Sequence, residues 1–275
     1  MKIKKRLDVL LVERLYADSR TKAQAIIMSG NVYVNGQKAD KPGTSFEETV
    51  DIEVRGAVCP YVSRGGLKLE KALRDFGVKP EGFVCSDSGA STGGFTDCLL
   101  QQGAKKVFAI DVGYGQLDWK IRSDERVVVM ERTNARYLPR EQIPDIPSVT
   151  VMDVSFISVK LILPKAAELM ENKGRFYILI KPQFEAGREN VGKKGVVRDP
   201  AVHRQVVEGI RDFVETMDYR MAQLDFSPIT GPEGNIEYIT ELLPASENLT
   251  AVDNDTIRAV VEAAHSTLAK KFMHA

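Results

Sequence analysis

A glycine-rich stretch after a short apolar run limits what this chain can fold into more than any other feature. The run Phe83-Val-Cys85 leads into Asp87-Ser-Gly-Ala-Ser-Thr-Gly-Gly-Phe-Thr96, and Asp97-Cys-Leu-Leu100 follows. A buried strand, a glycine turn and a helix in this order form the ligand crevice of a doubly wound α/β sheet. Glycines let the backbone approach a ligand closely, and the start of the helix offers free N–H groups. The stretch therefore predicts a cofactor-binding turn in an α/β fold.

A second predicted strand supplies an acid at the spacing expected of a nucleoside-binding fold. The segment Lys106-Val-Phe-Ala-Ile-Asp111 ends in Asp111, 24 residues after Asp87. An acid about 20 residues beyond such a turn commonly hydrogen-bonds ribose hydroxyls. The glycine spacing is G-x-x-x-G-G and differs from the G-x-G-x-x-G of dinucleotide-binding enzymes. Asp111 is thus the predicted ribose ligand, although a strand-end Asp also commonly caps the next loop.

The bulk properties favour a globular protein of one large and one small domain. The chain has 275 residues, of which 43% are hydrophobic, and it has no apolar run near the roughly 18 residues that span a membrane. The basic start is followed by acids instead of an apolar signal core, so we expect a cytoplasmic protein. The three cysteines lack metal-ligand spacing and are expected to be reduced, and we expect no metal site.

The first part of the chain is basic and predicts a small separate unit. Residues 1–41 hold nine Lys or Arg against four acids, although the net charge of the whole chain is zero. Two helices are predicted at 7–15 and from Ser19 or Thr21 to Gly30. Strands at 32–34 and 50–54, with an Asn-Gly turn after the first, complete an α+β unit that ends near Gly56. Residues 57–60 are the predicted linker.

From residue 61 onward, strands and helices alternate. A helix is predicted over 61–73, and further helices at about 159–170, 202–217 and 251–275. Repeated strand–helix units predict a parallel sheet with helices on both faces, here Rossmann-like and doubly wound. Seven strands are predicted, near 83–87, 106–111, 127–130, 148–153, 174–180, 220–226 and 237–242.

Polar residues follow several of these strands at the point where each strand ends. In an open α/β sheet, ligands bind beyond the carboxyl ends of the strands. A lysine directly after the apolar run 176–180 is unusual, because a buried ammonium must be paired or lose its proton. A surface salt bridge is the better interpretation of any one of these charges, but their shared sheet edge favours a site. The residues are Asp87, Asp111, Asn134, Asp153, Lys181 and, at the start of an antiparallel last strand, Glu237.

The segment over about residues 5–55 resembles an S-four-like RNA-binding module, named after a small-subunit ribosomal protein. The likeness rests on the order of a helix, a glycine stop, a short strand and an Asn-Gly turn within residues 19–37. It implies binding of the RNA backbone. The residues implied in RNA binding, together with one from the following helix, are Arg6, Arg20, Lys22, Lys38 and Arg64.

Almost the whole chain resembles the TlyA family, which joins such a module to an FtsJ-type S-adenosylmethionine-dependent RNA methyltransferase domain. The likeness rests on five ordered motifs: Ser63-Arg-Gly-Gly-Leu-Lys-Leu, the glycine turn, Val151-Met-Asp-Val-Ser-Phe, Ile180-Lys-Pro-Gln-Phe-Glu and Gly234-Asn-Ile-Glu-Tyr-Ile. The resemblance implies 2′-O-methylation of ribosomal RNA, or of a ribosomal subunit, with cytidine as the expected nucleotide. Some members of the family are labelled haemolysins.

FtsJ-type enzymes use a Lys-Asp-Lys-Glu tetrad, which this resemblance places at Lys68, Asp153, Lys181 and Glu237. If its pKa is lowered, Lys181 is the expected base or hydroxyl-orienting group; Asp153 and Glu237 hold it, and Lys68 steers the hydroxyl or a phosphate. Asp111 is expected to bind the cofactor ribose. Asn134 is expected at the adenine edge. The residues expected to hold the methionine portion are Asp87, Gly89, Ala90, Ser91, Thr92, Gly93, Gly94 and Phe95.

Three other functions remain open at this point. A nicotinamide-dependent enzyme would share the sheet and the ribose acid, but it would leave the basic N-terminal unit without a role. A membrane-active cytolysin is a second alternative, although the sequence lacks an amphipathic spanning pattern. The third is a non-catalytic ribosome-binding factor, which an intact tetrad argues against.

Overall fold

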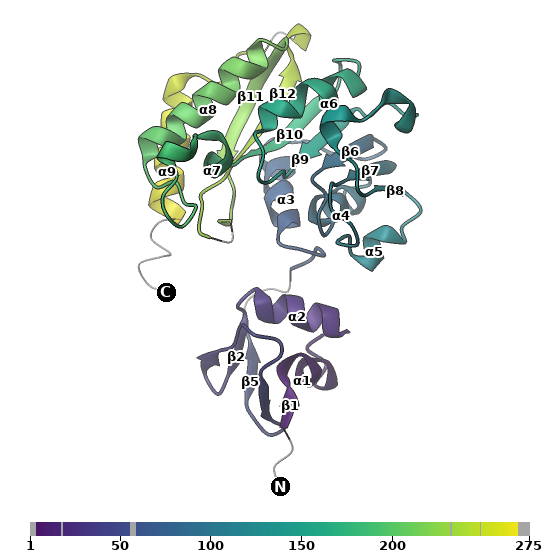
Figure 1. The fold of residues 1–275 in the computed structure, drawn as a ribbon, viewed down its shortest axis with the longest axis vertical. Helices are drawn as coiled ribbons and strands as arrows, with labels where there is room; N and C mark the ends of the chain where they lie inside the picture. The colour runs from purple at the N-terminus through teal and green to yellow at the C-terminus, as the bar shows by residue number, and fades with distance from the viewer. Residues whose placement is uncertain (1–3, 18, 56–58, 232, 248, 269–275) are drawn as a thin grey trace. The chain divides into compact units, whose positions relative to one another are not determined.

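The computed structural model describes residues 4–17, 19–55, 59–231, 233–247 and 249–268 (Figure 1). The chain divides into two compact units, residues 1–60 and 61–275. Residues 57 and 58 of the predicted linker, and Gly56 before it, lie outside the described residues.

The small unit contains two helices and two small sheets. Strand β2 lies between β3 and β5 in a three-stranded antiparallel sheet, and β1 pairs with β4. The short strands β1 and β4 were not predicted, and the last strand of the unit is shorter than predicted. The elements are β1 (Lys4–Arg6), α1 (Leu7–Glu13), α2 (Arg20–Met28), β2 (Val32–Val34), β3 (Gln37–Lys38), β4 (Ser45–Glu47) and β5 (Ile52–Val54).

Local sequence explains the boundaries of α2 and of the turn after β2. The Ser19 hydroxyl accepts a hydrogen bond from the Lys22 backbone N–H at 3.2 Å and so caps α2 at its start. Gly30 follows the helix with φ +76°, a left-handed conformation that glycine adopts without strain. Asn35 and Gly36 both have positive φ, as the tight turn between β2 and β3 requires. These features were predicted and are confirmed.

The large unit is built on one seven-stranded sheet with the order β11-β12-β10-β9-β6-β7-β8. Strand β12 runs antiparallel to β10 and β11, and the neighbours from β10 to β8 are parallel. The strands are β6 (Val84–Ser88), β7 (Lys106–Ile110), β8 (Val127–Met130), β9 (Val149–Met152), β10 (Arg175–Ile180), β11 (Tyr219–Phe226) and β12 (Tyr238–Pro244). The helices of four or more residues are α3 (Gly65–Asp75), α4 (Gly94–Gln101), α5 (Trp119–Arg122), α6 (Leu163–Leu169), α7 (Pro182–Glu185), α8 (Pro200–Glu215) and α9 (Asn254–Leu268).

Several predicted helices differ in their bounds from those observed. Helix α1 ends at Glu13 and not at residue 15, and α3 covers Gly65–Asp75 and not residues 61–73. The helix predicted over 159–170 is divided into the 3-10 turn η3 (Val159–Leu161) and α6, which has a proline in its first turn. Helix α8 begins two residues earlier than predicted, because the Asp199 side chain accepts from the Ala201 N–H and Pro200 fits the first turn. Helix α9 ends at Leu268 within the described residues, and the basic end predicted for it lies outside them.

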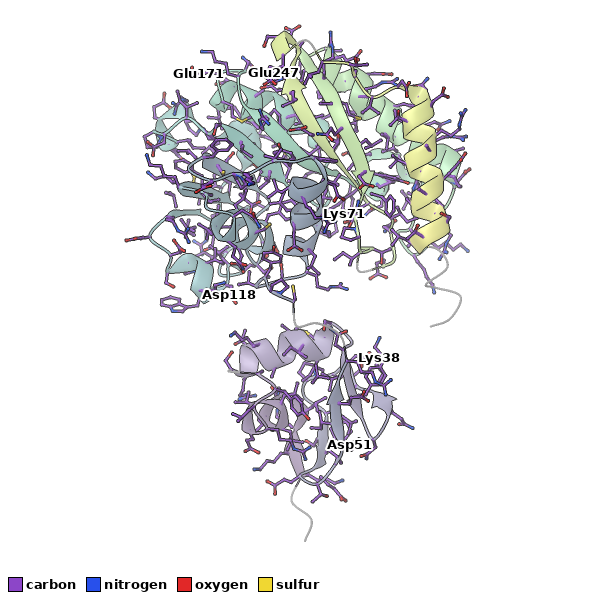
Figure 2. All side chains as sticks on the ribbon, turned by 180° about the vertical axis from the view of Figure 1, so that it is seen from behind. Lys38, Asp51, Lys71, Asp118, Glu171 and Glu247 are labelled. Atoms are coloured by element: carbon purple, nitrogen blue, oxygen red, sulfur yellow. The ribbon has the colours of Figure 1, made fainter. Side chains whose placement is uncertain are left out.

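Helices cover both faces of the sheet, as Figure 1 shows. Phe176, Ile178 and Ile180 alternate along β10 and pack in one core with residues of α6, α8 and α9. Tyr177 points to the other face, where its ring stacks with Phe76 at the end of α3, 6.5 Å between centroids. Lys71 of α3, labelled in Figure 2, is largely buried and forms ion pairs with Asp75 and with Asp225 of β11. The doubly wound architecture is therefore observed.

The order of strands reverses between β6 and β9, which is the switch point where ligands of such folds bind. The carboxyl ends of β6, β9 and β10 meet there, and Tyr238 at the start of β12 pairs with Ile180 at the end of β10. The antiparallel last strand thus brings Glu237 to the same edge as Lys181. Within the described residues, no helix has the length and hydropathy needed to span a bilayer.

Candidate active site

The glycine-rich turn lies directly against the end of the neighbouring strand. Gly89 has φ +87°, and a Cβ atom built on it would lie 3.1 Å from the Asp153 backbone oxygen. Gly94 begins α4, and a Cβ there would lie 3.0 Å from the Gly66 nitrogen at the start of α3. Side chains at these two positions would push the backbones of β9 and α3 away. The glycines therefore keep three segments of the site in close contact.

Asp87 lies beneath this turn and is fully buried. One carboxylate oxygen accepts a hydrogen bond from the Thr96 hydroxyl at 2.7 Å, while the other, Oδ1, has no hydrogen-bond partner among the described residues. Burial is the main cause that raises the pKa of Asp87 to about 7. A buried acceptor without a donor is costly and suits a ligand that brings a donor or a cation.

Asp111 connects the end of β7 to the glycine-rich turn. Its carboxylate accepts from the Ser91 N–H at 2.8 Å and from the Gly113 N–H at 2.7 Å. Each oxygen retains a second lone pair for a ligand hydroxyl. Asn134 is exposed, and its side-chain oxygen accepts from the Arg136 N–H at the start of the 3-10 turn η1 (Ala135–Tyr137).

Two lysines and two carboxylates alternate in a single cluster at the sheet edge. Lys68 Nζ lies 2.6 Å from a Glu237 oxygen and 3.5 Å from an Asp153 oxygen. The other Asp153 oxygen lies 2.5 Å from Lys181 Nζ, which also donates to the Ser155 hydroxyl at 2.9 Å. Lys68, Lys181 and Glu237 are buried. Asp153 thus contacts both lysines, whereas Glu237, which was expected to hold Lys181, pairs with Lys68 among the described residues.

Lys68 is a cation at neutral pH. Burial by itself lowers the pKa of Lys68, but the carboxylates of Asp153 and Glu237 outweigh burial and raise the pKa above the ordinary value of a lysine. The Lys68 side chain is buried, because α3 turns it into the sheet edge. Lys68 is therefore suited to attract an anion or to orient a hydroxyl, not to act as a base.

These groups share a pocket of about 300 Å³ with the glycine-rich turn. Of the predicted site residues, the pocket is lined by Arg64, Lys68, Gly89, Ala90, Ser91, Thr92, Gly94, Phe95, Asp153, Lys181 and Glu237. Four predicted cofactor residues do not line it. Asp87 lies beneath the turn, Gly93 faces Leu117 and Ile121, and Asp111 and Asn134 follow the adjoining strands.

The pocket includes residues that were not predicted. Ser155 contacts Lys181, and its place two residues after Asp153 is the one sequence signal that could have indicated it. Ile229, Thr230 and Gly231, which precede the motif that starts at Gly234, also line the pocket. Beside the pocket residue Ser155, Phe156 has φ +65° and 91% of its side chain is exposed, with its ring 5.2 Å from Phe184. Non-glycine residues in this backbone region are often functional.

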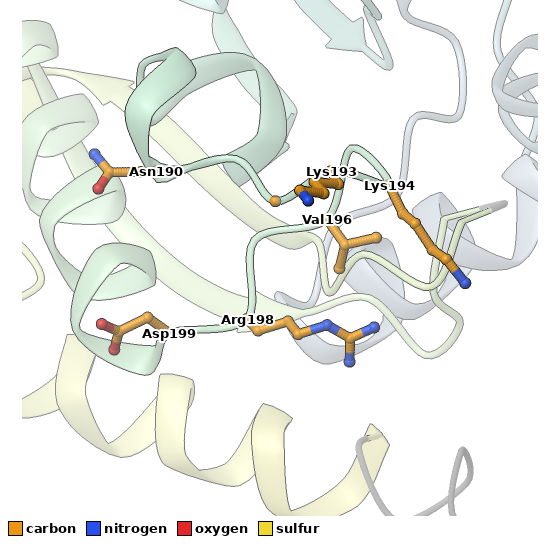
Figure 3. Close-up of a pocket in the computed structure, with 7 residues that line it drawn as sticks. Asn190, Lys193, Lys194, Val196, Arg198 and Asp199 are labelled. Atoms are coloured by element: carbon orange, nitrogen blue, oxygen red, sulfur yellow. The ribbon is translucent and has the colours of Figure 1, made fainter.

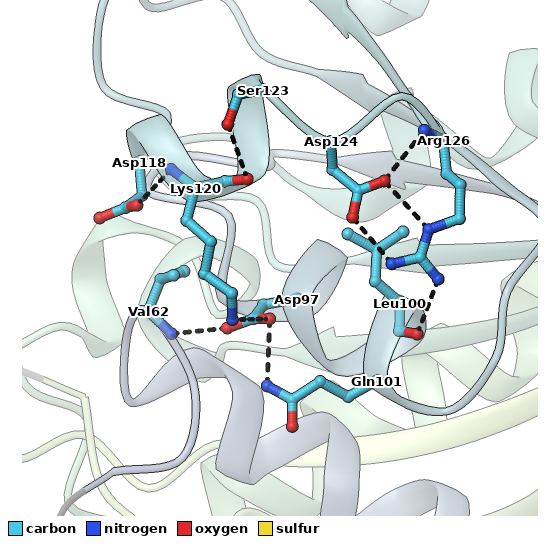
Figure 4. A network of polar contacts seen from close by, with 9 residues as sticks. All are labelled: Val62, Asp97, Leu100, Gln101, Asp118, Lys120, Ser123, Asp124 and Arg126. Carbon is cyan, nitrogen blue, oxygen red and sulfur yellow. Dashed lines mark hydrogen bonds and ion pairs between the residues drawn. The ribbon is translucent and has the colours of Figure 1, made fainter.

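A buried carboxylate of α4 binds the first residues of the large unit (Figure 4). Asp97 accepts hydrogen bonds from the Val62 N–H at 2.8 Å, from Gln101 at 3.1 Å and from Lys120 Nζ at 2.9 Å. Val62 directly precedes the Ser63-Arg64-Gly65 segment that lines the pocket. Asp97 therefore fixes this segment next to the glycine-rich turn.

In the small unit, two of the predicted RNA-binding arginines also have an internal partner. Arg6 and Arg20 lie 2.9 and 3.0 Å from the buried Asp8 carboxylate, which also accepts from Gln24. Arg6 is the largest cause that holds the pKa of Asp8 well below its usual range. About half of each arginine side chain stays exposed, so a role in RNA binding stays a prediction. Lys22, Lys38 and Arg64 are exposed.

Two family models match the chain, and each of them matches residues of one of the two units. The FtsJ-like methyltransferase model matches residues 61–242, and the S4 domain model matches residues 5–51. Both domain types predicted from the sequence are thereby confirmed.

Named relatives and a solved structure match over most of the chain. It is 51% identical to "Putative rRNA methyltransferase YqxC" of Bacillus subtilis, over 98% of this chain and 96% of the relative. It is 45% identical to Hemolysin A of Brachyspira hyodysenteriae, covering 86% and 99%. The 16S/23S rRNA (cytidine-2′-O)-methyltransferase TlyA of Mycobacterium tuberculosis is 42% identical, covering 85% and 87%. The solved structure "Putative hemolysin from Streptococcus thermophilus" is 42% identical, with a TM-score of 0.79, covering 99% and 100%. The chain therefore belongs to the TlyA family of FtsJ-like methyltransferases.

Proposed function

We propose that this protein transfers a methyl group from S-adenosylmethionine to a ribose 2′-oxygen of ribosomal RNA, with cytidine as the target. The observation that carries the proposal is the lysine–carboxylate cluster opening into the same pocket as the glycine-rich turn. Family membership and the cytidine-2′-O activity in the name of a relative support it. Since ribosomal RNA is the substrate, the site of action would be the cytoplasm.

The cofactor-binding role of the turn is supported by its free polar groups. When bound, S-adenosylmethionine supplies an electrophilic methyl group on a positively charged sulfur. Asp87 offers its unpaired Oδ1 to the ammonium of the methionine portion, and the backbone from Gly89 to Phe95 surrounds that portion. Asp111 hydrogen-bonds the ribose. Asn134, whose amide N–H₂ group is not used in capping, contacts the adenine edge.

The tetrad acts on the ribose hydroxyl of the substrate. Lys181 orients this hydroxyl and, in its neutral form, accepts its proton, while Asp153 and Ser155 hold the lysine in place. Lys68, held as a cation by Glu237 and Asp153, steers the hydroxyl or its neighbouring phosphate. Positioning of this kind supplies much of the barrier reduction in a methyl transfer, because the hydroxyl oxygen must meet the methyl group in line.

The two units have different functions in this proposal, RNA binding in the small unit and methyl transfer in the large one. Residues 1–56 would bind RNA through Lys22 and Lys38 together with the exposed parts of Arg6 and Arg20. Residues 57–60 would be the linker, and residues 61–275 would carry out the transfer, with Arg64 at the mouth of the pocket contacting the RNA.

The test is methyl transfer to ribosomal RNA from cells that lack the protein. Purified protein and labelled S-adenosylmethionine should give 2′-O-methylcytidine on digestion and mass spectrometry, and calorimetry should show binding of S-adenosylmethionine but not of NAD. Transfer to a base nitrogen or carbon, or binding of NAD alone, would refute the proposal. Because Hemolysin A is among the relatives, dye release from liposomes is the parallel test of membrane activity. We expect none at concentrations that methylate RNA.

A further inference from the structure

A second pocket of the large unit lies in the loop between α7 and α8 and is rich in positive charge. It has a volume of about 380 Å³ and is lined by Asn190, Gly192, Lys193, Lys194, Val196, Arg198 and Asp199. We call residues 192–198 the basic loop. Figure 3 shows Lys194 and Arg198 extending on the same side of Val196, away from Asn190 and Asp199. The volume is in the range of pockets that hold small ligands or single groups of larger ones.

The three cations of the basic loop have no protein partner among the residues that the structure describes. Lys193, Lys194 and Arg198 are exposed, and none of them forms an ion pair or a side-chain hydrogen bond within the described part of the chain. The neighbouring acid does not neutralise them, because a carboxylate oxygen of Asp199 caps α8 through the Ala201 N–H at 2.8 Å. Three exposed cations around one hollow create a positive local potential, which attracts an anion.

The backbone of the basic loop is nevertheless held firmly. Gly195, with φ +71°, donates to the Gly192 carbonyl at 2.8 Å, and the Gly192 N–H donates to the Val196 carbonyl at 3.1 Å. Val196 and Val197 are buried. The lysines therefore project from a closed turn whose apolar residues anchor it to the unit, and an ordered turn loses less entropy on binding than a free segment.

The buried amide of Asn235 ties the basic loop to the reaction pocket. Its oxygen accepts from the Val197 N–H at 3.1 Å, and its nitrogen donates to the Gly195 carbonyl at 2.9 Å. Asn235 is only 4% exposed and precedes the tetrad residue Glu237 by two positions. Its own carbonyl accepts from the Gly231 N–H at 2.9 Å, and Gly231 lines the reaction pocket. One segment thus borders the reaction pocket and holds the basic loop.

We propose that the basic loop binds the phosphodiester backbone of the substrate RNA next to the target nucleotide, through Lys193, Lys194 and Arg198. This inference rests on the proposed function, since it takes RNA as the substrate. Flexible ammonium groups and an arginine fork on an ordered turn suit phosphate oxygens without reading sequence. The contact adds a second RNA-binding surface, on the methyltransferase unit itself, to the one expected in the small unit. Asn235 is its positioning residue.

The test measures the affinity for RNA as a function of salt concentration for four variants of the full-length protein, one of which is Asn235→Ala. The pair Lys193→Ala and Lys194→Ala is compared with the charge-preserving pair Lys193→Arg and Lys194→Arg. The matched control is Lys79→Ala with Lys105→Ala, which removes two exposed lysines that precede β6 and β7, at the opposite edge of the sheet. The probes are ribosomal subunits and free ribosomal RNA from cells that lack the protein.

The alanine pair should bind the probe that the wild type methylates about tenfold more weakly at 0.1 M KCl. The slope of log affinity against log salt should fall by about 1.5, because two phosphate contacts are lost. The arginine pair and the control should keep the wild-type slope, and calorimetric affinity for S-adenosylmethionine should stay unchanged in all variants. Asn235→Ala should also weaken RNA binding, although this variant keeps every charge of the wild type.

Two results would overturn the inference. An alanine pair with wild-type affinity and slope would show that the loop does not contact RNA, and an arginine pair as weak as the alanine pair would show that its lysines act structurally. Methyl transfer by the wild-type protein is measured in a separate assay from RNA binding. If the wild type fails to methylate but its binding depends on these lysines, the proposed function fails while this inference stands.

Discussion

The reaction pocket is lined by residues 229–231 and Glu237, and Asn235 holds the basic loop, yet the lysines of these two regions differ in burial and in charge pairing. In the pocket, Lys68 and Lys181 are buried and each is within 2.6 Å of a carboxylate. In the basic loop, Lys193 and Lys194 are exposed and have no partner within the described residues. Buried cations must be neutralised by the protein, because an unpaired one costs several kcal/mol, whereas exposed cations can wait for a ligand in water.

The difference in charge pairing suits two functions, a reaction step in the pocket and the binding of RNA by the basic loop. A buried lysine paired with a carboxylate has a fixed position, which a reaction step on one hydroxyl requires. An unpaired, solvated lysine adds attraction for any polyanion and is screened by salt. We therefore expect changes in the pocket to affect the rate of transfer, and changes in the basic loop to affect the affinity for RNA.

The largest effect is expected from Lys181→Ala. Loss of the hydroxyl-orienting group should lower kcat for methyl transfer by about 1000-fold, while the affinity for S-adenosylmethionine changes by less than about threefold. Lys181→Met, which keeps the length of the side chain without its charge, should be equally slow. Lys173→Ala, at an exposed lysine after α6, is the control and should leave kcat unchanged. Single-turnover transfer of labelled methyl groups is the measurement, and near-normal transfer by Lys181→Met would remove Lys181 from the mechanism.

The second largest effect is on stability and concerns the buried ion pair between Lys68 and Glu237. Glu237→Ala leaves Lys68 buried with Asp153, at 3.5 Å, as its remaining carboxylate. The free energy of unfolding should fall by about 3 kcal/mol, as measured by urea denaturation followed by circular dichroism. Glu189→Ala, at an exposed acid just before the basic loop, should change it by less than about 0.5 kcal/mol. Equal stabilities of the two variants would show that the buried pair is not needed to hold Lys68.

The smallest effect concerns Asp87, a buried charge that lacks a full set of partners. Because burial raises its pKa to about 7, the carboxyl is largely protonated below that pH and cannot pair with an ammonium group. The affinity for S-adenosylmethionine should therefore rise about tenfold between pH 5.5 and 7.0, since binding favours the deprotonated form. Asp87→Asn should bind weakly with no such rise. A pH-independent affinity of the wild type over this range, measured by calorimetry, would contradict the assignment.

The sequence alone determined the elements whose causes are local. The Ser19 cap, the Gly30 stop and the Asn35-Gly36 turn depend on neighbours within a few residues, and they occur as predicted. The strand–helix alternation likewise predicted the seven-stranded sheet, because apolar periodicity reflects burial along a single element. The resemblance of five motifs was specific enough to indicate the family.

Only the tertiary structure decided which charges meet. The tetrad contact between Lys68 and Glu237 spans 169 residues, and no local pattern reports that α3 turns Lys68 into the sheet edge. The sequence also did not predict that Arg6 and Arg20 pair with Asp8. Nor did it predict that Asn134 is exposed. The link from Asn235 to the basic loop joins segments about 40 residues apart. Such contacts depend on strand order and on the packing of whole elements, which the free energy of the complete fold determines and local propensity does not.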